Sequence, residues 1–288
     1  MSDGPAKRRR YDEQLRGRGA RLAWRVEEPV PFCWLCDRVS GKRAREHVFP
    51  QWLLQALGAE DEEFHPVHRD MLGRLVSARG PIPARAFVAG EVCEACNHGW
   101  MSDLEVLVAP ILFPPGGRGT LSVRDQAVLS RWLIKTAVVL NTSQNYRLMV
   151  PREARHALAH GVPSDFGVYL ARHAQTDGGQ LNFMQVAGVS MSIVQSDRVD
   201  EHAHASERVY GCALAINDFL GVVIYAVPGA WAVPSEPMAR IWPPTQAVRW
   251  GDLPTFPELA ANFSLAGQHP EFGIEGLPSE VWMRATAE

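Results

Sequence analysis

Residues 91–105 read EVCEACNHGWMSDLE, and residues 32–54 read FCWLCDRVSGKRAREHVFPQWLL. Together the two stretches hold four of the five cysteines of this 288-residue chain, arranged as two Cys-x-x-Cys pairs. A histidine stands close to each pair. Paired thiols beside imidazoles are typical of metal sites in chains whose thiols stay reduced, so these stretches decide how the N-terminal part folds.

The spacing of the four cysteines predicts a structural metal site. A Cys-x-x-Cys turn places two thiolates on one face of a tight loop, and two such turns complete a tetrahedral Zn²⁺ site with Zn–S distances near ~2.3 Å. A site with four cysteine ligands has no open position, so its zinc would tie two distant segments together and contribute folding free energy. The alternative is four buried cysteines without a ligand. The expected zinc ligands are Cys33, Cys36, Cys93 and Cys96.

Composition places the chain among ordinary globular proteins, with 46% apolar and 21% charged residues. The sequence contains no run of 18 apolar residues, so it predicts no membrane span, and no membrane partner is expected. The N-terminus is basic but lacks the apolar stretch of a secretory signal, so we expect a cytoplasmic protein. Cys212 lies in an apolar segment and is predicted to be a core residue.

Basic residues are concentrated at the N-terminus, although the net charge of the whole chain is −3. Residues 1–45 hold 12 Lys and Arg against 6 Asp and Glu. Such a segment can neutralise phosphates; the alternative is a solvated, partly ordered arm. The residues expected to contact nucleic-acid phosphates are Arg8, Arg9, Arg10, Arg16, Arg18, Arg21, Lys42, Arg43 and Arg45.

The pattern along the chain predicts an α+β protein in three parts: a basic arm over 1–25, a metal module over 26–113 and a mixed domain over 114–288. In the module, FPQWLLQALG (49–58) predicts a helix ended by Gly58, and helical spacing follows Cys96. The polar segment 60–92 is expected to hold two short strands. The strongest helix is predicted over 122–142, with Lys135 on its basic flank. Strands are predicted at 165–173, 181–195, 207–227 and 239–244, with a hairpin near 216–221.

The dipeptide Glu46-His47 follows the first cysteine pair, and Asn97-His98 follows the second. If a zinc ion clamps the two pairs together, it also brings these four residues near each other. Carboxylate, imidazole and amide groups are the donors that a second, catalytic divalent cation takes from a protein.

This part of the sequence resembles the HNH endonucleases, and more narrowly the zinc-knuckle branch with the ββα-metal fold. The resemblance rests on Cys-x-x-Cys, then EHVFPxWL, then CxxCNxGWMSxLE, and spans residues 33–105. It implies a ββα-metal module and hydrolysis of DNA phosphodiester bonds with a catalytic Mg²⁺ or Mn²⁺; RNA stays open as a substrate. The family usually has Asp where Glu46 stands, and residues 58–92 contain no counterpart of its middle Asn.

The resemblance also implies roles for individual residues. His47 matches the general base that activates the attacking water, Glu46 matches the acidic metal ligand, and Asn97 matches the helix residue that completes the metal site. His98 is an expected extra ligand or phosphate contact. The C-terminal domain is expected to serve substrate recognition, regulation or dimerisation into a homodimer.

Two other functions stay open at this level: a zinc-knuckle nucleic-acid-binding protein without catalysis, and a regulatory or toxin-like protein whose C-terminal domain gates the nuclease. The remaining candidate residues have plainer readings. Two histidine pairs are expected to be solvated, and Glu105 is expected on a helix surface, with a supporting role at the metal as its alternative. The two pairs are His65 with His68, and His202 with His204.

Overall fold

The structure, a computed structural model, describes residues 33–36, 38, 42–64, 67–69, 75–78, 80–143, 150–174, 181–189, 208–226, 233–234, 238–256, 265–266 and 279–281. All of these residues belong to one compact unit, residues 31–288. The chain has both helices and antiparallel sheets, which confirms the predicted α+β class. No helix among the described residues is long and apolar enough to cross a membrane.

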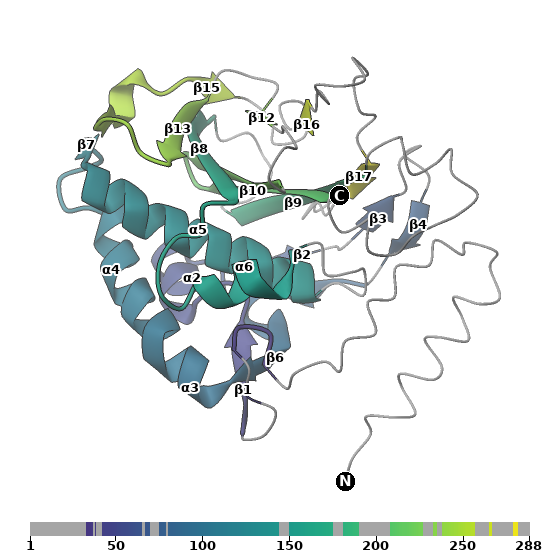
Figure 1. The fold of residues 1–288 in the computed structure, drawn as a ribbon. Coiled ribbons are helices and arrows are strands. Elements are labelled where there is room, and N and C mark those ends of the chain that lie inside the picture. The colour runs from purple at the N-terminus through teal and green to yellow at the C-terminus, as the bar shows by residue number, and fades with distance from the viewer. Residues whose placement is uncertain are drawn as a thin grey trace, which may run out of the picture. The chain divides into compact units, whose positions relative to one another are not determined.

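A two-stranded antiparallel pair followed by a helix forms the N-terminal part (Figure 1). Strand β1 pairs with β6, and the polypeptide runs from β6 directly into α3, a π-helical turn and α4. Helix α2 ends at Gly58, which adopts the left-handed conformation (φ 64°) that favours glycine, as predicted. Between α2 and β6 the described residues form four short strands, where two were expected. The bounds are β1 Arg43–His47, α2 Gln51–Leu57, β2 Glu63–Phe64, β3 Val67–Arg69, β4 Leu75–Ala78, β5 Ile82–Pro83, a 3₁₀ turn Ala84–Ala86, β6 Val88–Cys93, α3 Glu94–Cys96, the π-turn Asn97–Met101 and α4 Ser102–Leu112.

A seven-stranded sheet forms the C-terminal part, in the order β13-β8-β11-β10-β9-β17, with β15 parallel to β8. The predicted hairpin joins β10 to β11 through a two-residue turn, in which Asn217 has φ 56°. The bounds are β7 Thr120–Leu121, α5 Val123–Ser143, α6 Arg152–Ala157, β8 Phe166–His173, β9 Leu181–Val189, β10 Arg208–Ile216, β11 Phe219–Ala226, β12 Val233–Pro234, β13 Ala239–Trp242, β14 Val248–Arg249, a 3₁₀ turn Trp250–Asp252, β15 Thr255–Phe256, β16 Leu265–Ala266 and β17 Ser279–Val281.

Helix α5 is the central element, since it contacts the sheet strands β8, β11 and β13 and also β6 and α4 (Figure 1). Its N-terminus is capped by Ser122, whose hydroxyl accepts a bond from the N–H of Asp125 at 3.1 Å. Helix α5 passes so close to β11 that a Cβ on Gly221 would lie 2.9 Å from a methyl of Leu133. The Tyr210 hydroxyl also donates to the carbonyl of Ala137 at 2.8 Å. These contacts fix α5 against the sheet.

One cluster of buried side chains runs through both parts of the described chain. Phe87, which precedes β6, stacks on Phe183 of β9 at 5.7 Å between ring centroids. Cys33, Cys93 and Cys212 belong to the same cluster, which confirms the core placement of Cys212. The division at residue 113 into two domains stays a prediction.

Candidate functional site

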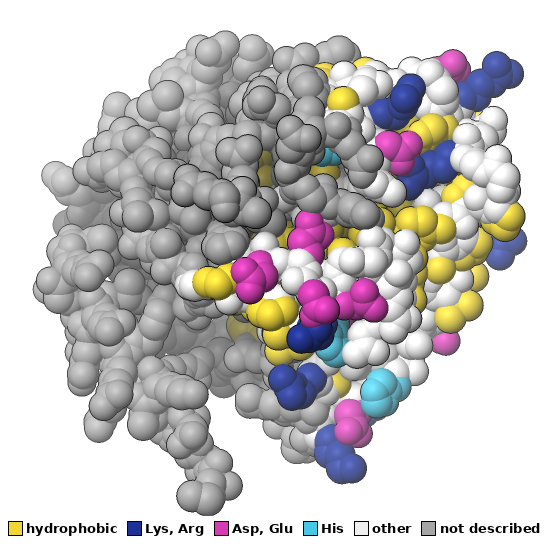
Figure 2. Space-filling model, turned by 180° about the vertical axis from the view of Figure 1, so that it is seen from behind, with side chains coloured by type: hydrophobic (Ala, Val, Ile, Leu, Met, Phe, Trp, Pro, Cys, Tyr) yellow, Lys and Arg dark blue, Asp and Glu magenta, His cyan; other side chains and the backbone are white. Residues whose placement is uncertain are grey.

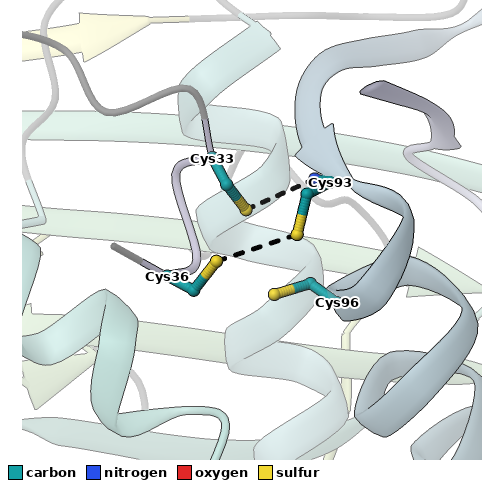
Figure 3. Close-up of side chains that lie close together, drawn as sticks. All are labelled: Cys33, Cys36, Cys93 and Cys96. Atoms are coloured by element: carbon teal, nitrogen blue, oxygen red, sulfur yellow. Dashed lines mark hydrogen bonds between the residues drawn. The ribbon is translucent and has the colours of Figure 1, made fainter. Parts of the chain in front are cut away.

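The four cysteines of the two Cys-x-x-Cys pairs converge on one point (Figure 3). Their sulfur atoms all lie within 4.8 Å of one another, and the Sγ atoms of Cys36 and Cys93 are 3.7 Å apart. Four sulfurs at ~2.3 Å from one tetrahedral ion would be separated by about 3.8 Å. The cluster therefore has the dimensions of a metal site. Among the described residues, no other group of three or more His, Cys, Asp or Glu side chains brings its ligand atoms that close.

The surroundings of the cysteines favour a thiolate, which is the form that binds metal. A hydrogen bond from Cys96 lowers the pKa of Cys33 to about 4. The backbone N–H of Cys93 donates to the same sulfur at 3.3 Å. The shared bond with Cys33 raises the pKa of Cys96, and burial raises that of Cys36. These hydrogen bonds favour a thiolate at Cys33, the form in which a cysteine sulfur binds a cation.

Two arginines from the C-terminal part contact the two Cys-x-x-Cys segments. The Arg155 guanidinium donates to the carbonyl of Trp34 at 2.9 Å and lies over the indole ring of that residue, 4.8 Å from its centroid. Arg131 lies 5.1 Å from the ring centroid of Trp100 and donates to the carbonyls of Leu158 and Ala159. The cysteine cluster is therefore packed against helices α5 and α6.

Strand β1 positions Glu46 and His47. Its pairing with β6 aligns Arg43 with Cys93 at one end and His47 with Val88 at the other, so the strand reaches from the cysteine cluster to the Glu-His dipeptide. Alternation along the strand buries Glu46, whose exposed fraction is 4%, and leaves Arg45 exposed. His47 is half-buried. The register shifts between residues 44 and 46, which marks a bulge just before the dipeptide.

Glu46, His47 and Asn97 line one surface cavity of about 220 Å³. Asn97 begins the π-helical turn after Cys96, in which Gly99 leaves helical geometry (φ −97°, ψ −118°). The structure thus brings together the three residues that the sequence analysis assigned to catalysis. The other lining residues are Arg45, Pro50, Gln51, Trp52 and Glu105.

Lys135 was predicted on the basic flank of an amphipathic helix, with contact to DNA as the alternative. Both interpretations need an exposed side chain and are wrong, because the side chain of Lys135 is fully buried beside this cavity. Its Nζ donates to Oε1 of Glu46 at 3.1 Å and to Oε1 of Glu105 at 2.9 Å. Burial by itself would lower the pKa of Lys135, but the two carboxylates outweigh it and raise that pKa. Lys135 therefore stays charged between β1 and α4.

Glu105 was expected on a helix surface, and the structure instead leaves only 21% of its side chain exposed. It lines the cavity, paired with Lys135. One signal in the sequence could have found it: Glu105 lies eight residues after Asn97, close to two helical turns, so both can face one side. Leu107 of the same helix is 48% exposed.

Several predicted site residues lie apart from the cavity. His98 is exposed and is not among the lining residues. Lys42 is exposed beside β1, and Arg43 lies on β1 with a side chain outside the described set. His68 lies on β3, and its side chain is likewise outside that set. The remaining ones fall outside the described residues altogether: Arg8, Arg9, Arg10, Arg16, Arg18, Arg21, His65, His202 and His204.

Charged side chains of both signs are mixed on the face drawn in Figure 2. On the described part of this face, basic side chains alternate with acidic and hydrophobic ones and form no continuous patch. Lys42 and Arg45 are both exposed at β1.

Comparisons of the chain with protein-family models, with curated proteins and with solved structures found no match.

Proposed function

We propose that this chain is a metal-dependent endonuclease of the HNH type that hydrolyses DNA phosphodiester bonds. One observation carries the proposal: Glu46, His47 and Asn97 come from two segments fifty residues apart and line the same cavity. An antiparallel strand pair followed by a helix supports it, because this is the topology expected of a ββα-metal module. RNA remains a second nucleic-acid substrate for the same chemistry.

In this proposal the four cysteines hold a structural Zn²⁺, and their mutual distances fit that ion. Glu46 and Asn97 would hold the catalytic Mg²⁺ or Mn²⁺, since carboxylate and amide oxygens are ligands for such hard cations. Bound there, the cation would stabilise charge on the scissile phosphate and on the leaving oxygen. Two protein ligands leave coordination positions for water and for phosphate oxygens.

His47 is the proposed general base. Its half-buried side chain lines the cavity, where it can take a proton from a water molecule beside the phosphate. A neutral imidazole suits this task because one of its ring nitrogens can accept a proton. Arg45 lines the same cavity and is exposed, so it can pair with a phosphate oxygen.

The test is cleavage of supercoiled plasmid by purified protein with Mg²⁺, Mn²⁺ or EDTA, for the wild type and for His47→Ala. We expect cleavage with a divalent cation, none with EDTA, and a loss of about 10²–10⁴-fold in rate for His47→Ala, the usual contribution of general-base catalysis. DNA binding and zinc content should stay unchanged, because the imidazole acts in the transition state. Wild-type rates from His47→Ala, or no cleavage by the wild type with any cation, would refute the proposal.

A second candidate is a nucleic-acid-binding protein that uses its zinc knuckles without catalysis. It is favoured by the burial of Glu46 and by its ion pair with Lys135, which together could give this carboxylate a purely structural role. A mobility-shift experiment and the plasmid assay together separate the two. A binding protein would slow the migration of DNA in the first and leave the plasmid intact with every cation in the second.

A further inference from the structure

Lys135 connects three elements beneath the cavity. It lies on α5, and its two partners lie on β1 and α4. The two bond lengths limit the separation of the bonded oxygens of Glu46 and Glu105 to 6.0 Å. Two carboxylates this close repel each other strongly when one of them is buried, unless a cation lies between them. Lys135 supplies that cation.

We infer that Lys135 is a positioning residue, which holds Glu46 and Glu105 at the cavity so that a divalent cation can bind there. The inference rests on the divalent-cation site of the proposed function and extends it to helix α5. The bond from Lys135 uses Oε1 of Glu46, so the Oε2 atom of this carboxylate is left for the cation. Glu105 holds the ammonium group from the α4 side and is not itself a ligand in this inference.

The charges of the three groups separate positioning from a simple electrostatic role. Glu46, Glu105 and Lys135 together carry −1, and Lys135→Met changes this sum to −2. If only charge mattered, that variant would attract a cation more strongly than the wild type. If Lys135 positions the carboxylates, the variant binds the cation more weakly, because Glu46 and Glu105 then repel each other out of place.

The experiment measures Mn²⁺ binding to the full-length, zinc-loaded protein by electron paramagnetic resonance of free Mn²⁺. We expect Lys135→Met to weaken Mn²⁺ binding by about 10–100-fold, the usual effect of removing a residue that orients a metal ligand. Adding Glu105→Gln to that variant should restore most of the affinity, because it removes the repulsion. Arg124→Met, which changes an exposed basic residue on the same helix, is the control and should bind like the wild type.

Three results would overturn the inference: unchanged or tighter Mn²⁺ binding by Lys135→Met, no recovery in the double variant, or no Mn²⁺ binding by the wild type. If Lys135→Met alone does not fold, the Mn²⁺ affinity of the double variant is compared with that of Glu105→Gln. There, loss of Lys135 should change Mn²⁺ affinity by less than about threefold, since the repulsion is already gone. A loss as large as that expected in the wild-type background would mean that Lys135 has only a structural role.

Plasmid cleavage on the same variants distinguishes this inference from the proposed function. If the wild type binds Mn²⁺, the binding depends on Lys135 and the plasmid is never cleaved, the nuclease is refuted and the positioning role is kept. If the wild type cleaves and Lys135→Met needs no more Mn²⁺ for its half-maximal rate, the nuclease is kept and the positioning role is refuted.

Discussion

Replacing Cys36 by Ser tests the cysteine cluster with the least disturbance of packing. Cys36 is half-buried, whereas its three partners are buried in the core, and Ser differs from Cys by one atom. A loss of stability in this variant therefore reports on lost metal binding and not on a cavity. The matched control is Cys212→Ser, which changes a buried thiol of β10 outside the cluster.

The magnitude follows from the metal site. Structural zinc typically binds with about 10–16 kcal/mol of apparent free energy, so one of four ligands accounts for roughly 2.5–4 kcal/mol. The free energy of unfolding of a whole domain is about 5–15 kcal/mol. Because each kcal/mol shifts the melting temperature of a chain of this size by about 2–4 °C, Cys36→Ser should melt roughly 10 °C below the wild type.

The assay combines zinc analysis of the purified protein with thermal unfolding followed by circular dichroism. Cys36→Ser should lose most of its zinc, and wild type stripped with a chelator should melt at a similar temperature. Cys212→Ser should keep its zinc, although burying a hydroxyl in an apolar strand costs about 1–3 kcal/mol. Purified wild type that contains no metal before any chelator is added, and that melts at the same temperature as Cys36→Ser, would refute the metal site.

Two further predictions concern ligands and DNA. Glu46→Gln and Asn97→Ala should lose cleavage at low Mn²⁺ and regain part of it at high Mn²⁺, in contrast to His47→Ala; Gln is chosen because its amide oxygen can still accept the bond from buried Lys135. A titration of rate against Mn²⁺ checks this, and an equal loss at all concentrations would contradict a ligand role. Removing residues 1–25 should weaken DNA binding for all sequences alike and flatten its salt dependence, because the arginines there are expected to contact phosphates. Binding measured at several salt concentrations decides the point, and an unchanged slope would mean that the arm is only solvated.

Local patterns in the sequence predicted much of the fold. The helix ended by Gly58, the helix over 122–142 and the hairpin near 216–221 were all predicted from apolar periodicity and turn residues within short windows. The clustering of the four cysteines was also predictable, because the Cys-x-x-Cys turn is a local geometry and only one metal site uses both pairs. The number of short strands between α2 and β6 could not be predicted, since strands of two to four residues carry almost no periodic signal.

The clustering of the four cysteines and the grouping of Glu46, His47 and Asn97 beside them follow from the sequence alone, since these residues are neighbours along the chain. The burial of Lys135 and its pairing with Glu105 depend on tertiary packing. A lysine on a helix is nearly always exposed, so sequence reasoning assigns it to solvent. Lys135 is buried because helix α5 lies between the sheet and the β1–β6 pair, where two carboxylates from elements 89 and 30 residues away meet its ammonium group. Pairing across such separations leaves no periodic trace in the sequence, because it depends on how whole elements pack.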